Sequence, residues 1–539
     1  EGVGTKLSRL YSINTWGAVC GAGLAGFGML PAIGLKASIF LAAAINLAIG
    51  FFAHALGRRH SHKPEPKDRP VEGKSPSTAL LPWIFGLCGF SSMALQLGWT
   101  RGLALCLGGA VYSFSAILVV FLSGIALGSL LYPWVFRDKR VTVGWIHLAW
   151  LCLLMALTGA LSVVLVGNLP LAFAKALPLF SDHYSKVLLL NLLLSGVVLL
   201  PPTLLMGLSF PLVTHLYHRH NGALGKSIGN IYGANTLGCI LGSFSAGFIG
   251  LPLVGVENTL RIAVSCYLLA AVASCWLSQR NKVRSATLGL VAGLALATWI
   301  LPPWNTGLTS AGVAVYAGTT QSLLNRPNPL FYQDGLTCSV AFEFVAPDMP
   351  VLRVNGKIDA SLGLSDRINM YLTGLIPLLY VENPSRVGVI GLGGGLTLTS
   401  VAGSPRVNRV DCAELEPAVI EVQKYWAPYV ESVHQNPKVK LLEADGRTFI
   451  LGAGENFDII ISEPSNPWIA GIGNLYTREF YQNSKKKLSD DGVFLQWCNL
   501  YAISPDDLNM VLRSFFQCYE HGDIWLGGGD LMLIGSKKP

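Results

Sequence analysis

Residues suited to nucleoside chemistry gather in the last third of the chain. Gly391, Gly393 and Gly395 form a glycine-rich turn directly after the short apolar stretch 387–390. Glycine at such a turn permits positive φ angles and lets a ligand approach the backbone closely. Glu414 ends the next apolar stretch about 20 residues later, where a carboxylate can accept hydrogen bonds from ribose hydroxyls. The turn alone would indicate only a structural strand–helix connection, but the turn and the spaced acid together predict a nucleoside site.

Further candidate residues continue this pattern along the chain. Asp445 and Gly446 follow one apolar stretch, and Glu463 directly follows another, Phe457–Ser462. We expect each at the carboxyl end of a strand, because doubly wound sheets bind their ligands at that edge. Glu463 is suited to general-base catalysis, and the alternative is a helix-capping or structural acid beside Pro464. Both interpretations stay open here, and the base is the one we favour.

The residues around these positions predict an α/β domain preceded by a small β unit. Residues 330–360 alternate apolar and polar residues in short runs, which is typical of strands joined by a hairpin. A helix is expected over 366–380, and strands and helices then alternate from Val387. We therefore divide this part of the chain into a small β unit with a connecting helix, 304–380, and a Rossmann-like domain, 381–539.

The composition separates this part from a very apolar first half. Of 539 residues, 51% are hydrophobic and only 13% charged, against about 25% charged in ordinary soluble domains. The long apolar runs lie in residues 1–303, and the net charge of +8 comes largely from short loops between them. This distribution indicates membrane orientation and argues against a nucleic-acid partner. The eleven cysteines are scattered without a C-x-x-C pair, so we expect them to pack in apolar regions and expect no metal site.

Residues 1–303 predict a multi-pass transmembrane helical domain. A helix needs about 20 mostly apolar residues to cross a bilayer. Nine stretches qualify: 13–30, 36–56, 81–107, 112–135, 144–167, 187–214, 229–250, 258–278 and 285–303. Lysine and arginine cluster in the links 58–74, 137–140, 219–226 and 280–284, which alternate with the cation-poor links 168–186 and 251–257. This alternation is typical of the positive-inside rule. We expect no aspartate or glutamate inside a span, so transport chemistry is the less favoured function.

An internal repeat lies within these spans. Residues 10–35 recur at 231–256. The shared residues include Asn14, Pro31 and Gly34, which recur as Asn235, Pro252 and Gly255. A duplicated six-helix unit explains the repeat, and six-helix halves of this kind resemble the major facilitator transporters. The chain begins at Glu1 without a methionine, so we expect the first unit to be truncated.

Residues 330–539 resemble the spermidine synthase family of aminopropyltransferases. The matching motifs are Gln333-Asp334-Gly335, Asn355-Gly356-Lys357-Ile358-Asp359, the glycine turn 391–395, Glu414-Leu415-Glu416, Ala444-Asp445-Gly446-Arg447, Ser462-Glu463-Pro464-Ser465-Asn466-Pro467 and the segment 475–481. The combination with membrane helices is similar to the fused major-facilitator/spermidine-synthase proteins. The resemblance implies a methyltransferase-like Rossmann fold with a small N-terminal β domain.

The resemblance also implies roles for individual residues. The donor, S-adenosylmethionine or its decarboxylated form, would be bound by Gly391, Gly393, Gly395, Glu414, Glu416, Asp445 and Gly446. Glu463 would be the general base, without a metal. The amine acceptor would contact Asn466, Asp359, Asp366 and Gln333. The implied function is a membrane-bound transferase that moves an aminopropyl or related alkyl group to an amine.

Several departures from the family pattern fall on the chemistry. The family's glycine turn carries an aspartate for the donor's ammonium, and Gly394 stands there in this chain. The second acid of the family's Asp-x-x-Asp-Pro segment is replaced by Asn466, and Asn369 and Met370 stand where a polar aromatic pair is usual. A buried ammonium without a counter-charge is costly, so these changes indicate an altered acceptor. A methyltransferase on the same fold, and a transporter or scaffold with a nucleoside-sensing domain, stay open as alternatives.

The segment 285–303 decides on which side of the membrane the soluble domain lies. The basic links 137–140 and 280–284 are expected in the cytosol. The segment is apolar, just long enough to cross, and ends near Trp299 and Trp304, so we expect it to cross the cell (inner) membrane and place the domain outside. S-adenosyl donors are made in the cytosol, so a segment lying in the interface stays the alternative. The expected partners are the lipid bilayer and a small amine, with a homo-oligomer through the soluble domain left open.

Overall fold

The structure, a computed structural model, divides into two compact units. It describes residues 3–59, 76–136, 143–181, 183–221, 224–278, 281–430 and 433–539. The helical unit comprises Glu1–Leu107, Tyr112–Asn305 and Ala317–Thr320, and the α/β unit comprises Gly108–Val111, Thr306–Tyr316 and Gln321–Pro539. Most of the predicted basic link 58–74 and all of 137–140 lie outside the described residues.

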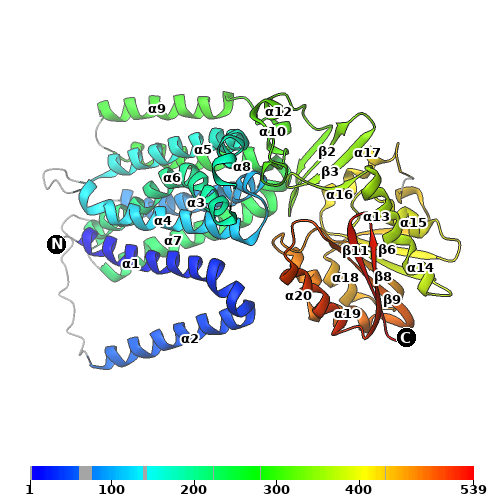
Figure 1. The fold of residues 1–539 in the computed structure, drawn as a ribbon. Helices are drawn as coiled ribbons and strands as arrows, with labels where there is room; N and C mark the ends of the chain where they lie inside the picture. The colour runs from blue at the N-terminus through cyan, green and yellow to red at the C-terminus, as the bar shows by residue number, and fades with distance from the viewer. Residues whose placement is uncertain are drawn as a thin grey trace. The chain divides into compact units, whose positions relative to one another are not determined.

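Long apolar helices make up the helical unit (Figure 1). Their bounds are α1 Val3–Leu24, α2 Leu30–Arg59, α3 Leu81–Leu107, α4 Val111–Val135, α5 Trp145–Phe180, α6 Tyr184–Asn221, α7 Leu224–Ser245, α8 Leu251–Trp276 and α9 Asn281–Ile300. The short turns are η1 Ala25–Met29, η2 Pro76–Leu80 and η3 Ala246–Gly250. Among the described residues, 7 helical segments are long and apolar enough to cross a membrane. Two of them, Gly4–Arg58 and Leu224–Trp276, each contain two of the nine predicted spans.

The two copies of the internal repeat share an unusual local geometry. The helices α1 and α7 each have 22 residues, and each continues directly into a π-helical turn of 5 residues. Beyond these turns, Gly34 in α2 and Gly255 in α8 interrupt the helix, with φ 73°, ψ 174° and φ 82°, ψ 173°. Glycine is the residue that adopts such angles readily, so each bend depends on a glycine of the repeat. Figure 1 accordingly shows α1 and α2 as two arms joined at a bend.

The predicted link 251–257 belongs to helix α8 in the structure. This helix contains Glu257, predicted in a link, and Arg261 one turn later, and the two side chains form an ion pair. Arg261 also donates to the carbonyl oxygens of Leu301 (3.1 Å) and Pro302 (3.3 Å). The second carboxylate oxygen of Glu257 accepts the backbone N–H of Trp304 (2.9 Å). Trp304, predicted as an interfacial anchor, is therefore held by polar contacts to α8, and the buried charges satisfy each other.

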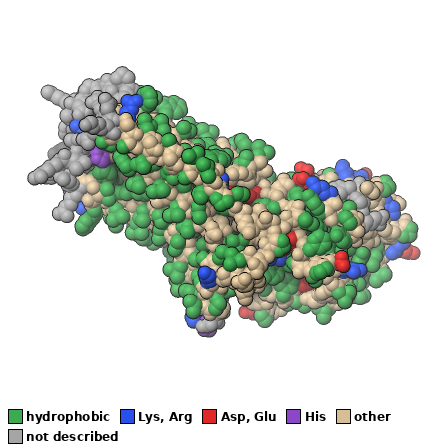
Figure 2. Space-filling view, turned by 90° about the horizontal axis from the view of Figure 1, so that it is seen from above, with side chains coloured by type: hydrophobic (Ala, Val, Ile, Leu, Met, Phe, Trp, Pro, Cys, Tyr) green, Lys and Arg blue, Asp and Glu red, His purple; other side chains and the backbone are tan. Residues whose placement is uncertain are grey.

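Apolar side chains cover much of the surface of the helices. Figure 2 shows wide hydrophobic areas there, with few charged side chains among them. In α2, the side chains of Phe40, Leu47 and Phe51 are 74%, 76% and 71% exposed. Extended exposed apolar surface marks a contact with lipid or with another protein, and helices of this length and composition suit a bilayer.

The α/β unit begins with a small antiparallel sheet. Its strands are β1 Phe331–Asp334, β2 Ser339–Ala346, β3 Met349–Val354 and β4 Lys357–Ser361, paired in chain order. Three short helices precede it, α10 Thr306–Thr309, α11 Val313–Tyr316 and α12 Thr320–Leu324. The sheet stands where the alternation over 330–360 predicts a β unit, and it buries Phe342 and Leu352.

A second sheet of seven strands, in the order β10-β11-β9-β8-β5-β6-β7, forms the core of the α/β unit. Its strands are β5 Arg386–Ile390, β6 Arg409–Glu414, β7 Val439–Glu443, β8 Phe457–Ser462, β9 Leu488–Asn499, β10 His521–Gly527 and β11 Asp530–Ser536. The strands β5 to β9 pair in parallel, and β10 and β11 are antiparallel. The accompanying helices are α13 Leu364–Leu375, α14 Pro377–Tyr380, α15 Leu396–Ala402, α16 Pro417–Glu421, α17 Gln423–Trp426, α18 Gly446–Gly452, α19 Arg478–Lys486 and α20 Pro505–Phe516, with the turns η4 Val433–Gln435 and η5 Ile472–Tyr476.

Both faces of this sheet are buried. Successive side chains of a strand point to opposite faces. In β8 and β9, Ile461 and Leu495 belong to one apolar cluster, and Ile460 and Phe494 belong to another. The apolar runs that predict these strands therefore reflect burial on both sides, as in other doubly wound sheets.

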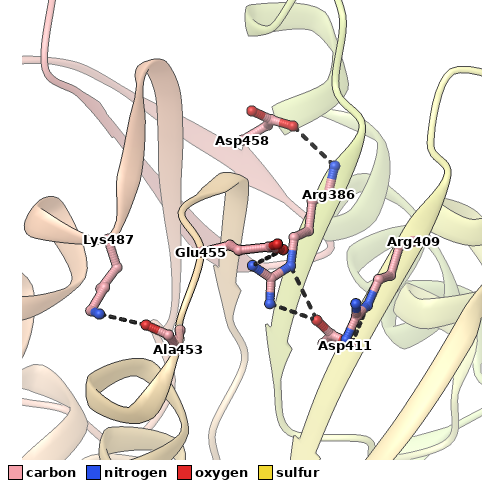
Figure 3. Close-up of polar contacts among 7 residues, drawn as sticks. All are labelled: Arg386, Arg409, Asp411, Ala453, Glu455, Asp458 and Lys487. Carbon is pink, nitrogen blue, oxygen red and sulfur yellow. Dashed lines mark hydrogen bonds and ion pairs between the residues drawn. The ribbon is translucent and has the colours of Figure 1, made fainter.

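Charged residues pair with each other near the starts of the parallel strands (Figure 3). Arg386 contacts Asp411 (3.1 Å) and Glu455 (3.2 Å). Arg409 contacts the other oxygen of Asp411 (2.9 Å), and Asp458 accepts the backbone N–H of Arg386 (2.9 Å). These contacts join β5, β6 and β8 at their amino ends, so the group is structural and the opposite edge is where a ligand is expected.

Candidate functional site

The carboxyl ends of β5, β6, β7 and β8 form one edge of the main sheet. The strand β5 lies between β6 and β8, so the chain turns to opposite sides of β5 as the sheet is built. Doubly wound sheets bind ligands at such a switch point. The glycine turn 391–395 follows β5, Glu414 ends β6, Asp445 follows β7 and Glu463 follows β8. The structure therefore brings these four predicted positions together.

Two features require glycine at position 391: its backbone conformation and its close packing against the segment that begins at Glu463. Its φ angle is +94°, and a Cβ atom there would lie 2.4 Å from the carbonyl oxygen of Glu463. The backbone N–H of Glu463 donates to the carbonyl oxygen of Ile390 (2.9 Å). The glycine turn and the start of the Glu463 segment are thus built against each other. Gly393 and Gly395 also have positive φ angles, +50° and +82°, so the whole turn follows a course that favours glycine.

Gly394, where the resemblance implies an aspartate, faces the small β unit. A Cβ atom there would lie 3.3 Å from the Cβ of Ala360 and 3.4 Å from the ring of Trp426. Both neighbours are buried, so a carboxylate at this position would have to displace one of them. The Trp426 ring occupies this space, and residue 394 supplies no counter-charge to a donor ammonium.

Glu414 lies against the glycine turn and contacts its backbone. Its Oε2 accepts the backbone N–H of Leu392 in the glycine turn (3.0 Å), and its Oε1 accepts that of Glu416 (2.9 Å). Burial raises the pKa of Glu414, the hydrogen bonds from these backbone groups oppose the rise, and the charge of Asp359 adds to it. A carboxylate oxygen has two lone pairs, so each oxygen can still accept a hydrogen bond from a ligand.

Glu416, predicted beside Glu414 as a donor-binding acid, is engaged by the protein itself. Its Oε2 accepts the backbone N–H (2.7 Å) and the hydroxyl (2.8 Å) of Thr337, and the backbone N–H of Cys338 (3.2 Å). Its Oε1 accepts the backbone N–H of Ala418 (3.4 Å) and so caps α16. Only 3% of the residue is exposed. The arrangement assigns Glu416 to holding the turn between β1 and β2 against the Rossmann-like domain.

Asp445 and Gly446 lie at the end of β7, at the start of α18. One carboxylate oxygen of Asp445 accepts the backbone N–H (2.9 Å) and the hydroxyl (3.0 Å) of Thr448. The residue is exposed, and its second oxygen suits an adenine amine as donor. A Cβ atom at Gly446 would lie 2.5 Å from Cγ2 of Ile390. Gly446 therefore acts through packing, because it lets α18 approach the end of β5.

Glu463 is half-buried and has a raised proton affinity. Burial raises its pKa from the ordinary 4.5 to about 7, a hydrogen bond with Thr397 opposes the rise, and the negative charge of Asp530 adds to it. A general base is most effective when its pKa lies near the working pH. The next helical turn along the chain, η5, is capped by Gly471, so helix capping beside Pro464 does not explain Glu463.

The β unit contributes two of the predicted acceptor-binding residues to this region. Asp359 pairs with Lys357 (2.7 Å) and accepts the hydroxyl of Ser465 (2.8 Å), two residues after Glu463. Asp366, in the first turn of α13, accepts the hydroxyl of Ser361. Gln333 lies in β1, which is the other edge strand of the small sheet from the β4 strand of Asp359. The structure therefore does not bring Gln333 together with these acids.

Two residues with unusual surroundings complete the edge. Asn466 is fully buried, and neither end of its carboxamide has a hydrogen-bond partner among the described residues. Asp530 begins β11, is only 7% exposed, and accepts a hydrogen bond from Asn369 Nδ2 (2.7 Å). No motif in the sequence marks Asp530 as a candidate site residue. Its signal is the preceding run Gly527-Gly528-Gly529, which predicts a tight turn that returns the chain to this edge.

Comparisons with known proteins find similarity to polyamine aminopropyltransferases. Residues 370–519 match the family model described as the spermine/spermidine synthase domain. "Polyamine aminopropyltransferase 1" of Ralstonia nicotianae is 24% identical over 450 residues, which are 81% of this chain and 78% of the relative. The "Polyamine aminopropyltransferase" of Methanocaldococcus jannaschii is 36% identical over 121 residues, 22% of this chain and 41% of the relative.

Solved structures similar to the chain include spermidine synthases. One, in complex with the transition state analogue AdoDATO, is 21% identical and covers 39% of this chain and 74% of its own, with a TM-score of 0.37. The spermidine synthase from Thermotoga maritima is 19% identical and covers 39% of this chain and 72% of its own, with a TM-score of 0.35.

Proposed function

Residues 370–519 form a spermine/spermidine synthase domain, and we propose that the chain is a membrane-bound aminopropyltransferase-like enzyme. It moves an aminopropyl or related alkyl group from a donor of the S-adenosylmethionine type to an amine. The observation that carries this proposal is Glu463, a half-buried residue whose desolvated carboxyl has a pKa of about 7 and whose backbone packs against the glycine turn at the end of β5. A base thus lies beside the turn that binds the nucleoside.

The donor fits the residues around the glycine turn. The turn from Gly391 to Gly395 provides a close backbone approach, because its φ angles are positive at three positions. Glu414 accepts the ribose hydroxyls with the lone pairs that its two backbone contacts leave. Asp445 accepts the adenine amine. Glu416 keeps the small β unit in place beside the turn.

The reaction is a nucleophilic displacement at the carbon bonded to the donor's sulfonium. The acceptor's amine nitrogen must be unprotonated to attack. As the new C–N bond forms, the C–S bond breaks, its electron pair goes to sulfur, and a neutral thioether leaves. The attacking nitrogen becomes positively charged and passes a proton to the Glu463 carboxylate. The ordinary pKa of a glutamate is too low for this step, and burial raises the pKa of Glu463 to about 7.

The electrostatics of this edge suit cationic substrates. Five carboxylates gather here, those of Glu414, Glu463, Asp359, Asp366 and Asp530. They influence one another, because Asp359 raises the pKa of Glu414, Asp530 raises that of Glu463, and Asp366 raises that of Asp530. Lys357 offsets part of this charge through its pair with Asp359. A sulfonium donor and an amine acceptor both gain from such an environment.

One observation favours a second candidate, methyl transfer on the same fold. Gly394 and the Trp426 ring leave no acid for the ammonium of an aminopropyl donor at this turn. In the family that acid belongs to aminopropyl transfer, so its loss is compatible with a donor that gives up its methyl group instead. Both reactions use a sulfonium donor and need a base at Glu463.

A product screen by mass spectrometry tests the proposal. The purified full chain is incubated with S-adenosylmethionine or its decarboxylated form and with a panel of primary amines and diamines. Aminopropyl transfer adds the mass of an aminopropyl group to the amine and releases methylthioadenosine. Methyl transfer adds a methyl group and releases S-adenosylhomocysteine. If neither product forms while the nucleoside still binds, the enzyme proposals fail and the sensor alternative takes their place.

We also propose that the helical unit spans the cell (inner) membrane. Support comes from the 7 long apolar helical segments and their exposed apolar side chains. The Ralstonia match of 450 residues is longer than the segment 306–539, so it extends into the helices, which favours a shared architecture. The segment Val283–Ile300 is apolar and long enough to cross, and with cytosolic basic links it would place the α/β unit on the outer face.

A further inference from the structure

One face of the main sheet carries a group of polar side chains that the proposed reaction does not yet use. Side chains alternate between the two faces of a strand, so Glu463 continues the face of Ile461 in β8. Asn499 continues the face of Leu495 in β9, and Asp530 is its register partner in β11. The cluster that contains Ile461 and Leu495 lies on this face. Glu463, Asn499 and Asp530 therefore belong to one face at the carboxyl edge.

Asp530 is held in place without using up its capacity to accept hydrogen bonds. Its Oδ2 accepts from Asn369 Nδ2 (2.7 Å), and its Oδ1 accepts the backbone N–H of Leu500 (3.3 Å). Each oxygen keeps a lone pair. Its charge is felt at Glu463, whose pKa it raises, and Lys357 opposes the rise in the pKa of Asp530 itself. The carboxylate is thus fixed, buried and near the base.

Around Asp530, buried carboxamide oxygens lack partners. Asn369 Oδ1 and Asn499 Oδ1 accept no hydrogen bond from any described residue. Their orientation is set by their other ends, because Asn369 Nδ2 must face the Asp530 carboxylate and Asn499 Nδ2 donates to the Tyr501 carbonyl oxygen (2.6 Å). Asn369 is 6% exposed and Asn499 is 0% exposed. Buried acceptors without donors are rare and destabilising, so a ligand that donates hydrogen bonds to these two oxygens would stabilise them.

A primary ammonium can donate hydrogen bonds to the side-chain oxygens of Asn369 and Asn499. It has three N–H donors, no acceptor and one positive charge, which match unpartnered oxygens beside a carboxylate. A hydroxyl group would fit less well, because its oxygen is a further acceptor and it carries no positive charge to pair with the Asp530 carboxylate. No group of three or more His, Cys, Asp or Glu residues that could hold a metal ion occurs among the described residues, so a metal is the weaker match. The chemistry therefore selects an organic cation.

We propose that Asp530, oriented by Asn369, is the counter-ion that fixes the non-reacting ammonium of the acceptor and so determines acceptor specificity. The inference rests on the proposed transfer reaction and names the residue that replaces the acid absent at Asn466. The acceptor is then a diamine, with one amine next to Glu463 and the other at Asp530. A cation held by Asp530, Asn369 and Asn499 orients the reacting nitrogen toward the base.

Calorimetry on the full chain in detergent tests this assignment without any turnover. The probes are 1,4-diaminobutane and 1-aminopentane, which have the same number of heavy atoms and differ in one terminal ammonium. The wild type should bind the diamine roughly 10- to 100-fold more tightly, as for a charge-assisted hydrogen-bonded contact. Asp530→Asn should weaken the diamine to the level of the monoamine and leave methylthioadenosine binding unchanged. The control Asp490→Asn changes an exposed acid, 85% accessible, at the start of β9 and should alter neither.

The outcomes separate this inference from the proposed reaction. Equal binding of the two amines by the wild type would overturn it, even if Asp530→Asn failed to fold, because that comparison needs no variant. Unchanged diamine binding by a folded Asp530→Asn would overturn it as well and would leave only water at the unpartnered oxygens. If the product screen finds no transfer while diamine binding depends on Asp530, the cation site stands and the reaction is wrong.

Discussion

Replacing Glu463 by glutamine separates a catalytic carboxylate from a structural one, because the two roles predict opposite changes in stability. Glutamine keeps the size of the side chain and removes its charge. For a general base, turnover should fall by about 10²–10⁴ while methylthioadenosine still binds. The wild-type rate should also rise with pH through about 7, as Glu463 loses its proton. A structural acid predicts normal turnover and a less stable variant.

The expected gain in stability follows from the raised pKa. Burial moves the pKa of Glu463 from 4.5 to about 7. Each pKa unit corresponds to about 1.4 kcal/mol, so the ionised carboxylate lowers the free energy of unfolding by about 3 kcal/mol. Below pH 4.5 the carboxyl is protonated in both states and contributes nothing. Between pH 4.5 and about 7 the unfolded chain releases the proton first, so stability falls as the pH rises, and the full loss remains above that range.

Thermal unfolding of the full chain in detergent, followed by near-ultraviolet circular dichroism, measures this difference. Glu463→Gln should match the wild type in acid and unfold at a higher temperature in alkali, by about 2–4 °C per kcal/mol for an α/β unit of this size. Glu382→Gln is the control, since Glu382 is exposed and should show no pH-dependent difference. A variant that is less stable than the wild type at every pH, or that keeps full turnover, would refute the reasoning.

Three further predictions address other parts of the molecule. Glu416→Gln should lower stability by about 1–3 kcal/mol, because three backbone N–H groups and the Thr337 hydroxyl donate to this carboxylate; an unchanged unfolding temperature would contradict that role. Asp445→Ala should weaken methylthioadenosine binding by about 1–3 kcal/mol, and Gly393→Val should block it; calorimetry showing wild-type affinity in both variants would disprove the nucleoside site. A cysteine introduced near Lys485 should react with an impermeant reagent in intact cells, and labelling only after lysis would exclude an outer α/β unit.

Local patterns were sufficient for much of the fold. Short apolar runs between polar turns predict β5 and β8, because both faces of these central strands are buried. Alternation predicts the small sheet, and glycine with a spaced acid predicts the edge where Glu414 and Glu463 meet. Each of these signals depends on residues close in the sequence, so each can be read without knowing what packs against them.

Contacts between segments far apart in the chain could not be predicted from the sequence. Glu257 was predicted to lie in a link, since nothing local shows that the backbone N–H of Trp304, 47 residues away, donates to its carboxylate. Glu416 reads as a donor-binding acid beside Glu414, but it faces the turn at Thr337. Glu414 and Glu416 lie only two residues apart, and they differ in the residues that the fold packs against each.

The sequence by itself determined the small β unit, the alternation of strands and helices around the glycine turn, the apolar character of the first unit and the acids available for chemistry, because these follow from residue types at fixed spacing. Only the tertiary structure decided the pKa values of those acids and the charges that surround them. Burial after β8 gives Glu463 its raised pKa, and the antiparallel return of β11 brings Asp530 to the same face, opposite Asn499. Proton affinity and charge pairing depend on what surrounds a side chain, and those surroundings come from segments far apart in the chain.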